Sequence, residues 1–107
     1  MYETQVEVKK MGEGTSASGD AGLIDRVRNA ILKCDCFKEI RETVPGGGSE
    51  DATWMMRRVQ EGGGQAVYMA LGADIAAPHH NGRFDLDESC MILGVKALDA
   101  IVDELIR

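Results

Sequence analysis

The chain has 107 residues, of which 44% are hydrophobic and 28% charged, so it is long enough for one domain built around one core. Its net charge of −6 argues against nucleic acid as a main partner, because phosphate binding needs a basic face. No apolar run is long enough to span a membrane and no signal peptide is recognisable, so we expect a cytoplasmic protein.

The first third of the chain predicts a strand, a loop and a helix. Apolar or small side chains alternate with polar ones from Tyr2 to Lys9, which is the period of a strand with one buried face. The stretch from Gly12 to Gly19 is rich in Gly, Ser and Thr and predicts a loop. Asp20 can cap a helix expected from Ala21 to Cys34, with apolar residues on one face.

The cysteines are interpreted as free thiols, because the chain has an odd number of them and carries no secretion signal. Cys34-Asp35-Cys36 has one residue between its cysteines, whereas redox and zinc-knuckle motifs have two. We therefore interpret this run as the end of the helix. The third cysteine is Cys90.

The middle of the chain contains a glycine-rich turn. Residues 40–44 predict a short strand that ends before Pro45. After three glycines, Ser49 is expected to cap a helix that runs to about Gln60 and is stopped by Gly62-Gly63-Gly64. The side chains expected in the core from this helix are Ala52, Trp54, Met55, Met56 and Val59.

The last third predicts a strand, a loop and a long helix. The apolar run Ala66 to Leu71 is typical of a buried strand. The loop from Pro78 to Glu88 follows, and a helix that opens at Asp87 spans about Glu88 to Ile106. The apolar stripe expected on this helix consists of Met91, Val95, Leu98, Val102 and Leu105.

Strands and helices in this order predict an α/β fold, with a partial sheet and flanking helices. Two strong strands make a thin sheet, and a long polar loop separates the first strand from the rest. The pattern therefore resembles a part of a larger architecture.

Both histidines stand side by side, His79 and His80, in the loop before the last helix. A neutral imidazole is a good ligand for zinc or manganese, and loops that follow strands often carry active-site residues. A metal site needs three or four ligands, however, and only this pair is visible. From spacing alone, a plain polar loop is the simpler interpretation.

The turn before the second predicted helix also has two interpretations. Ser49 and Glu50 at a helix start are most often only a cap. Alternatively, the glycine-rich turn and the free N–H groups of the helix bind a carboxylate or oxyanion of a substrate. The glycine spacing fits neither the Walker motif nor the dinucleotide fingerprint, so we do not predict a nucleotide site.

Two motifs together carry a resemblance to a known family. The run from Gly48 to Thr53, followed about thirty residues later by the run from His79 to Glu88, resembles the C-terminal end of the dinuclear metallo-amidohydrolases. This is the family of acetylornithine deacetylase, carboxypeptidase G and hippurate hydrolase. The resemblance implies that residues 1–11 match the last strand of a lid or dimerisation domain, and residues 12–107 the C-terminal part of the catalytic domain.

The resemblance also implies roles for individual residues. His80 matches the family's last metal ligand, and His79 is its neighbour on the substrate side. The segment formed by Gly48, Ser49 and Glu50 matches the lining of the substrate site. Gly82 stands where the family usually has proline, a departure that loosens the loop but leaves the ligand in place.

The family's other ligands and its general base belong to an N-terminal half with no counterpart in this chain, which therefore has no catalytic residue of its own. We expect a segment of a zinc- or manganese-dependent amidohydrolase that cleaves N-acyl amino acids and is inactive alone. Its partners would be the missing N-terminal half, a small N-acyl amino acid and further copies of itself, without nucleic acid or membrane. The alternative is a non-catalytic binding or assembly module that keeps the fold.

Overall fold

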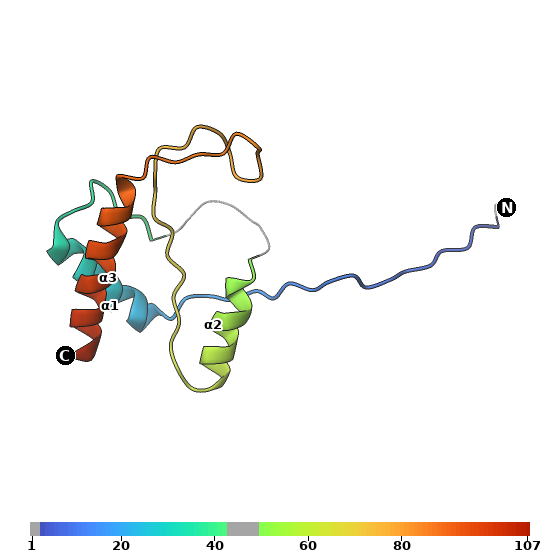
Figure 1. Cartoon of the computed structure of the whole chain (residues 1–107). Helices are drawn as coiled ribbons and strands as arrows, with labels where there is room; N and C mark the ends of the chain where they lie inside the picture. Colours follow the sequence, from blue (N-terminus) through green and yellow to red (C-terminus); the bar gives the residue numbers. More distant parts are fainter. Residues whose placement is uncertain (1–2, 43–49) are drawn as a thin grey trace.

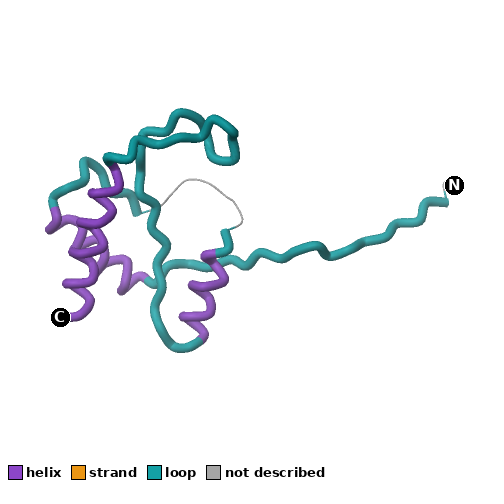
Figure 2. Tube along the Cα trace, in the orientation of Figure 1, coloured by secondary structure: helices purple, strands orange, loops and turns teal. Residues whose placement is uncertain are grey.

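A computed structural model describes residues 3–42 and 50–107, and within these ranges the chain forms three helices. They are α1 (Ala21–Cys34), α2 (Ala52–Glu61) and α3 (Cys90–Ile106) (Figure 1). The described residues contain no strand, and their only β pairing is an isolated antiparallel bridge between Ile75 and Leu86 (Figure 2). The predicted α/β fold with a partial sheet is therefore wrong.

The predicted strands are absent because nothing in the described part of the chain pairs with them. A strand is stable only when its backbone groups bond to a neighbouring strand and one face is buried. The N-terminal segment instead leads away from the helices (Figure 1), and its Val8 is 87% exposed. In the apolar run 66–71, Tyr68 is 51% exposed. Residues 40–42 form no strand either, while Thr43 and Val44 lie outside the described residues.

The core lies between α1 and α3, which is the only helix pair in extensive contact within the described ranges. Val27, Ala30 and Ile101 are buried there, and Leu23, Ile31 and Val67 pack around them. Near the C-terminal ends of both helices, the Lys33 ammonium of α1 lies 2.7 Å from the Glu104 carboxylate of α3. The predicted bounds of the first helix are confirmed, because its apolar period and left-handed end are local features. Asp20 stands at the N-cap position, but its side chain makes no capping hydrogen bond, so the expected cap is wrong.

The apolar stripe predicted for α3 is wrong, because a different side of the helix is buried. Ala97 and Ile101 face the core, whereas the stripe residues are exposed, Leu98 at 56% and Val102 at 54%. The helix has two apolar sides, and α1 can cover only one of them. The small side chain of Ala30, itself 1% exposed, allows close approach by the side that carries Ala97.

Helix α2 packs mainly on the segment before α1. Its Trp54 indole donates to the Glu13 carbonyl at 3.3 Å, its Arg57 guanidinium to Thr15 Oγ1 at 2.8 Å, and its Gln60 amide to the Ser18 carbonyl at 2.8 Å. These three donors are spaced by three residues and lie on one side of the helix. The helix ends at Gly62 as predicted.

The predicted core from α2 is largely wrong. Only Met56 is buried, while Trp54, Met55 and Val59 are exposed, Met55 by 66%. Helix α2 packs mainly on the extended segment formed by residues 13–18. One extended segment is too narrow to cover the whole apolar face of the helix. The expected Ser49 cap lies outside the described residues.

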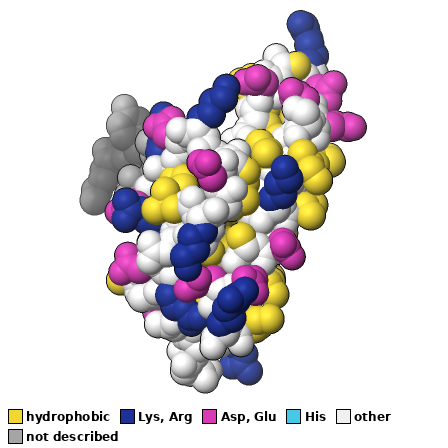
Figure 3. Space-filling view, turned by 90° about the vertical axis from the view of Figure 1, so that its left-hand side faces the viewer, with side chains coloured by type: hydrophobic (Ala, Val, Ile, Leu, Met, Phe, Trp, Pro, Cys, Tyr) yellow, Lys and Arg dark blue, Asp and Glu magenta, His cyan; other side chains and the backbone are white. Residues whose placement is uncertain are grey.

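The molecule exposes far more surface than a compact monomer of its size. Its accessible surface is 9322 Å², against about 5,800 Å² expected for a compact chain of this mass. Its radius of gyration is 18.7 Å, against about 13 Å expected. Figure 3 shows hydrophobic side chains clustered on the face it displays. Within the described ranges, no helix has the length and apolar character needed to cross a membrane.

Candidate functional site

His79 and His80 lie in a loop that spans residues 74–87 and is called the histidine loop below. Two backbone hydrogen bonds close this loop at its base. The Ala76 N–H donates to the Asp85 carbonyl and the Asp87 N–H to the Asp74 carbonyl, both at 2.9 Å. They flank the bridge between Ile75 and Leu86. The loop at the top of Figure 1 is therefore a closed, hairpin-like turn that projects its tip away from the α1–α3 core.

The tip is shaped by Asn81. Its carbonyl accepts the Phe84 N–H and its side-chain oxygen accepts the Arg83 N–H, both at 2.9 Å. His80 has a φ of 61°, a left-handed conformation that few residues other than glycine adopt. No role was predicted for Asn81 from the sequence, although an Asn-Gly pair is a strong turn signal.

The two histidines have different surroundings. The His79 ring stacks on the Phe84 ring, with centroids 5.1 Å apart and planes 28° apart. This contact fixes His79 within the loop. His80 stacks on no ring among the described residues, and both histidines are exposed.

Asp87 holds the start of α3. Its carboxylate accepts the Ser89 N–H at 2.9 Å, and its carbonyl accepts the Cys90 N–H at 3.2 Å. The bonds from the backbone and side chain of Ser89 hold the pKa of Asp87 below its usual value. Asp87 was expected to cap the last helix, but the N-cap residue is Ser89 and the regular helix begins at Cys90 instead of Glu88, so Asp87 holds the turn just before the helix.

The described residues do not assemble a metal site by themselves. Nowhere in residues 3–42 and 50–107 do three or more His, Cys, Asp or Glu side chains gather around a common point. Zinc sites use at least three protein ligands. His80 thus stays a predicted ligand, and the remaining ligands of any metal would have to come from outside this part of the chain.

The predicted substrate residues are only partly described. Gly48 and Ser49 lie outside the described residues. Glu50 is exposed ahead of α2, where its carbonyl accepts the Thr53 hydroxyl at 2.6 Å. Among described residues, nothing bonds to the Glu50 carboxylate, and no hydrogen bond joins it to the histidine loop. Its role on the substrate side stays a prediction.

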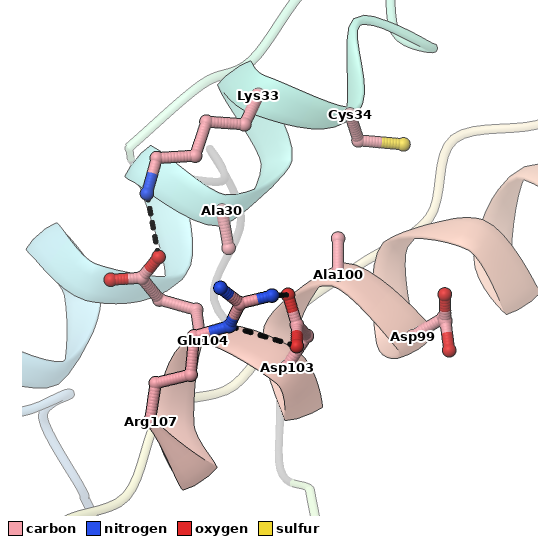
Figure 4. Close-up of a pocket in the computed structure, with 8 residues that line it drawn as sticks. All are labelled: Ala30, Lys33, Cys34, Asp99, Ala100, Asp103, Glu104 and Arg107. Atoms are coloured by element: carbon pink, nitrogen blue, oxygen red, sulfur yellow. Dashed lines mark hydrogen bonds and ion pairs between the residues drawn. The ribbon is translucent and has the colours of Figure 1, made fainter.

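A groove of about 550 Å³ lies between α1 and α3 (Figure 4). Lys33 reaches across it to Glu104, and Arg107 folds back onto Asp103 at 2.7 Å. The charges of these two pairs already have partners, whereas the carboxylate of Asp99, which also lines the groove, forms no ion pair among the described residues. Neither histidine takes part. A second hollow of about 400 Å³ lies at the base of the histidine loop, between residues 74–76 and 85–87.

Comparison with known proteins identifies three curated relatives. The chain is 37% identical over 99 residues to indole-3-acetyl-aspartic acid hydrolase of Enterobacter agglomerans, covering 92% of the chain and 23% of the relative. It is 36% identical over 105 residues to a Haemophilus influenzae homolog of the A subunit of p-aminobenzoyl-glutamate hydrolase, covering 98% and 24%. It is 37% identical over 99 residues to the A subunit of the Escherichia coli p-aminobenzoyl-glutamate hydrolase, covering 92% and 23%.

These relatives confirm the resemblance drawn from the two motifs, and two of them are named as the A subunit of p-aminobenzoyl-glutamate hydrolase or its homolog. The chain spans about a quarter of the length of the relatives it matches. No family model matches the chain. No solved structure matches it either.

Proposed function

We propose that this chain, homologous to about a quarter of the p-aminobenzoyl-glutamate hydrolases, is a segment of an amidohydrolase that cleaves an N-acyl amino acid such as p-aminobenzoyl-glutamate. The observation that carries the proposal is the relationship itself, which reaches 98% of the chain in one relative. The names of all three relatives describe hydrolases whose substrates join an aromatic or heteroaromatic acyl group to an acidic amino acid.

The exposed surface of the chain supports its role as a segment. The 9322 Å² of accessible surface exceeds the value of about 5,800 Å² for a compact chain of this mass. Helix α3 also leaves large apolar side chains exposed, among them Val95, Leu98 and Val102. In this proposal the partner is the polypeptide that supplies the rest of the hydrolase. The names of two relatives describe a subunit, which is consistent with assembly from more than one chain.

Within the assembled enzyme, His80 is the residue that would meet a metal. It is exposed at the tip of a loop whose base is tied, so its imidazole is presented at a defined place. Zinc or manganese is the metal class that an imidazole suits. The His79 ring, stacked on Phe84, would form a neighbouring wall, and the turn from Gly48 to Glu50 would contact the substrate.

The second candidate is a non-catalytic binding or assembly module. The observation that favours it is that no three potential ligands gather among the described residues. The two functions differ in what addition of the missing part should do. A segment of an enzyme gains turnover when it is completed, whereas an assembly module binds without turnover.

The test combines the chain with the region of the Escherichia coli relative that lies outside the match, in the presence of zinc or manganese. Release of p-aminobenzoate from p-aminobenzoyl-glutamate is measured for each component and for the mixture. We expect turnover only in the mixture, because the residues that the structure describes in this chain gather no set of three metal ligands. Metal-dependent turnover by the chain alone, abolished by His80→Ala, would overturn the proposal.

A further inference from the structure

The chain reverses direction directly after α1, and two cysteines flank the reversal. Cys34 is the last residue of the helix, and Asp35 follows in the left-handed conformation with φ 49° and ψ 34°. The Asp35 N–H donates to the Leu32 carbonyl at 3.2 Å, which closes the end of the helix. The turn brings Cys36 back beside Cys34.

The geometry joins these two cysteines. Their Cα atoms are 5.4 Å apart, within the range that a disulfide requires, and their sulfurs are bonded. The interpretation of Cys34 and Cys36 as free thiols is therefore wrong, whereas Cys90 is free among the described residues. The pairing could not be predicted from sequence because it depends on the left-handed backbone at Asp35, a conformation that few non-glycine residues adopt.

Both cysteines are half-buried, so a small reagent can reach the sulfurs while the helix still holds Cys34 in place. Figure 4 shows Cys34 at the end of α1, beside the groove between the two helices. An ion pair between Arg28 and Glu42, at 3.3 Å, holds the returning segment along α1. The partners are 48% and 61% exposed, so this pair alone stabilises the reversal only weakly.

We propose that Cys34 and Cys36 form a reversible dithiol–disulfide site that exchanges with low-molecular-weight disulfides such as oxidised glutathione. One cysteine thiolate attacks a sulfur of the small disulfide, forms a mixed disulfide and releases one small thiolate. The second cysteine thiolate then attacks the protein sulfur of the mixed disulfide and releases the other. The protein dithiol is oxidised, the small disulfide is reduced to two thiols, and these take up the two protons.

This site is independent of the proposed hydrolase function, because neither cysteine belongs to the histidine loop or to the substrate turn. It has a structural consequence for the chain. In the disulfide form the bond fixes the reversal after α1, whereas in the dithiol form the reversal depends on Asp35 and the exposed Arg28–Glu42 pair. Reduction is therefore expected to loosen residues 36–42 while α1 and α3 stay packed.

The experiment is a redox titration of the whole chain in glutathione buffers, followed by alkylation and mass spectrometry. Trypsin cuts after Lys33 and Lys38, so both cysteines fall in one short peptide. We expect this peptide to change in one two-electron step between a doubly alkylated form and a bridged form that carries no alkyl group and is two hydrogens lighter than the unmodified dithiol peptide. Cys90, which has no neighbouring cysteine among the described residues, should be found alkylated or as a glutathione adduct and never bridged, and Cys90→Ser should leave the transition unchanged.

A matched variant and a second condition complete the test. Cys36→Ser should abolish the bridge and leave Cys34 as a glutathione adduct. In strong denaturant, the equilibrium constant for bridging should fall by at least about tenfold, because the folded turn preorganises the sulfurs. Two of the possible results would overturn the proposal. One is separate glutathione adducts on both cysteines with no bridged peptide at any buffer ratio, and the other is equal bridging in the denatured chain.

Discussion

Asp20 and Ala66 are joined by a reciprocal pair of hydrogen bonds. The Asp20 N–H donates to the Ala66 carbonyl at 3.0 Å, and the Ala66 N–H donates to the Asp20 carboxylate at 2.8 Å. The same carboxylate accepts the Gln60 side-chain amide at 2.8 Å. One residue thus ties together the start of α1, the end of α2 and the segment that leads to the histidine loop.

We predict that Asp20→Ala uncouples these three elements. The Ala66 N–H and the Gln60 amide would lose their acceptor, so unfolding in urea should begin at lower concentration. Hydrogen exchange at the Ala66 amide should accelerate by at least about tenfold. In the variant, local opening of the backbone at Ala66 no longer has to break a hydrogen bond to the charged Asp20 carboxylate. Asp25→Ala is the matched control on the exposed side of α1 and should change neither quantity. Equal exchange rates in the wild type and in Asp20→Ala would contradict the role of the carboxylate.

The same contacts predict how stability depends on pH. Hydrogen bonds from the Gln60 side chain, and then from the Ala66 backbone, hold the pKa of Asp20 below its ordinary value of 3.8. A lowered pKa in the folded state contributes stability above the unfolded value, and this is lost as pH falls through the folded value. The urea midpoint should therefore fall as pH drops below about 4, and less steeply in Asp20→Asn. A midpoint with the same pH dependence in both proteins would show that Asp20 is not responsible.

The two histidines should differ in their effect on metal. In the complete enzyme, His80→Ala should lose most of the metal at one site together with the activity, because it removes a predicted ligand. His79→Ala should lose less, because this ring is held within the loop by Phe84. Metal content measured by inductively coupled plasma spectrometry checks both variants. An equal metal content in the wild type and in His80→Ala would contradict the role of His80 as a metal ligand.

The exposed side of α3 predicts self-association of the chain when no other polypeptide covers it. Its apolar residues at 91, 95, 98, 102 and 105 alternate spacings of four and three, which places them in one continuous seam. Replacing Val95 and Val102 together by glutamate should raise the dissociation constant of the self-associated form by on the order of a hundredfold, because unpaired charges would be buried. Sedimentation velocity gives the measurement.

Val8→Glu provides the control for that experiment, since Val8 is equally apolar but lies on the extended N-terminal segment. It should leave the association unchanged. A monomeric wild-type chain at high concentration would contradict the prediction.

The sequence determined those parts of the molecule that depend on neighbouring residues. The apolar period and the end at Cys34 were sufficient to place α1, and the glycines after Glu61 were sufficient to end α2. Local chemistry also placed the two histidines on a loop ahead of the last helix. It likewise placed Asp87 next to the start of that helix, where its carboxylate accepts the Ser89 N–H. Hydrogen bonds of this kind join residues only a few positions apart, so a single stretch of sequence contains all the information they need.

Only the tertiary structure decided which apolar segments are buried. The run from Ala66 to Leu71 has the composition of a strand, yet a strand exists only where another strand supplies its hydrogen-bond partners. Helix α3 has two apolar sides, and the contact with Ala30 of α1, not the period, selects the side that carries Ala97 and Ile101. The orientation of His79 and His80 depends likewise on Asn81 and Phe84. Burial is a property of pairs of surfaces, so it cannot be read from the residues of one surface alone.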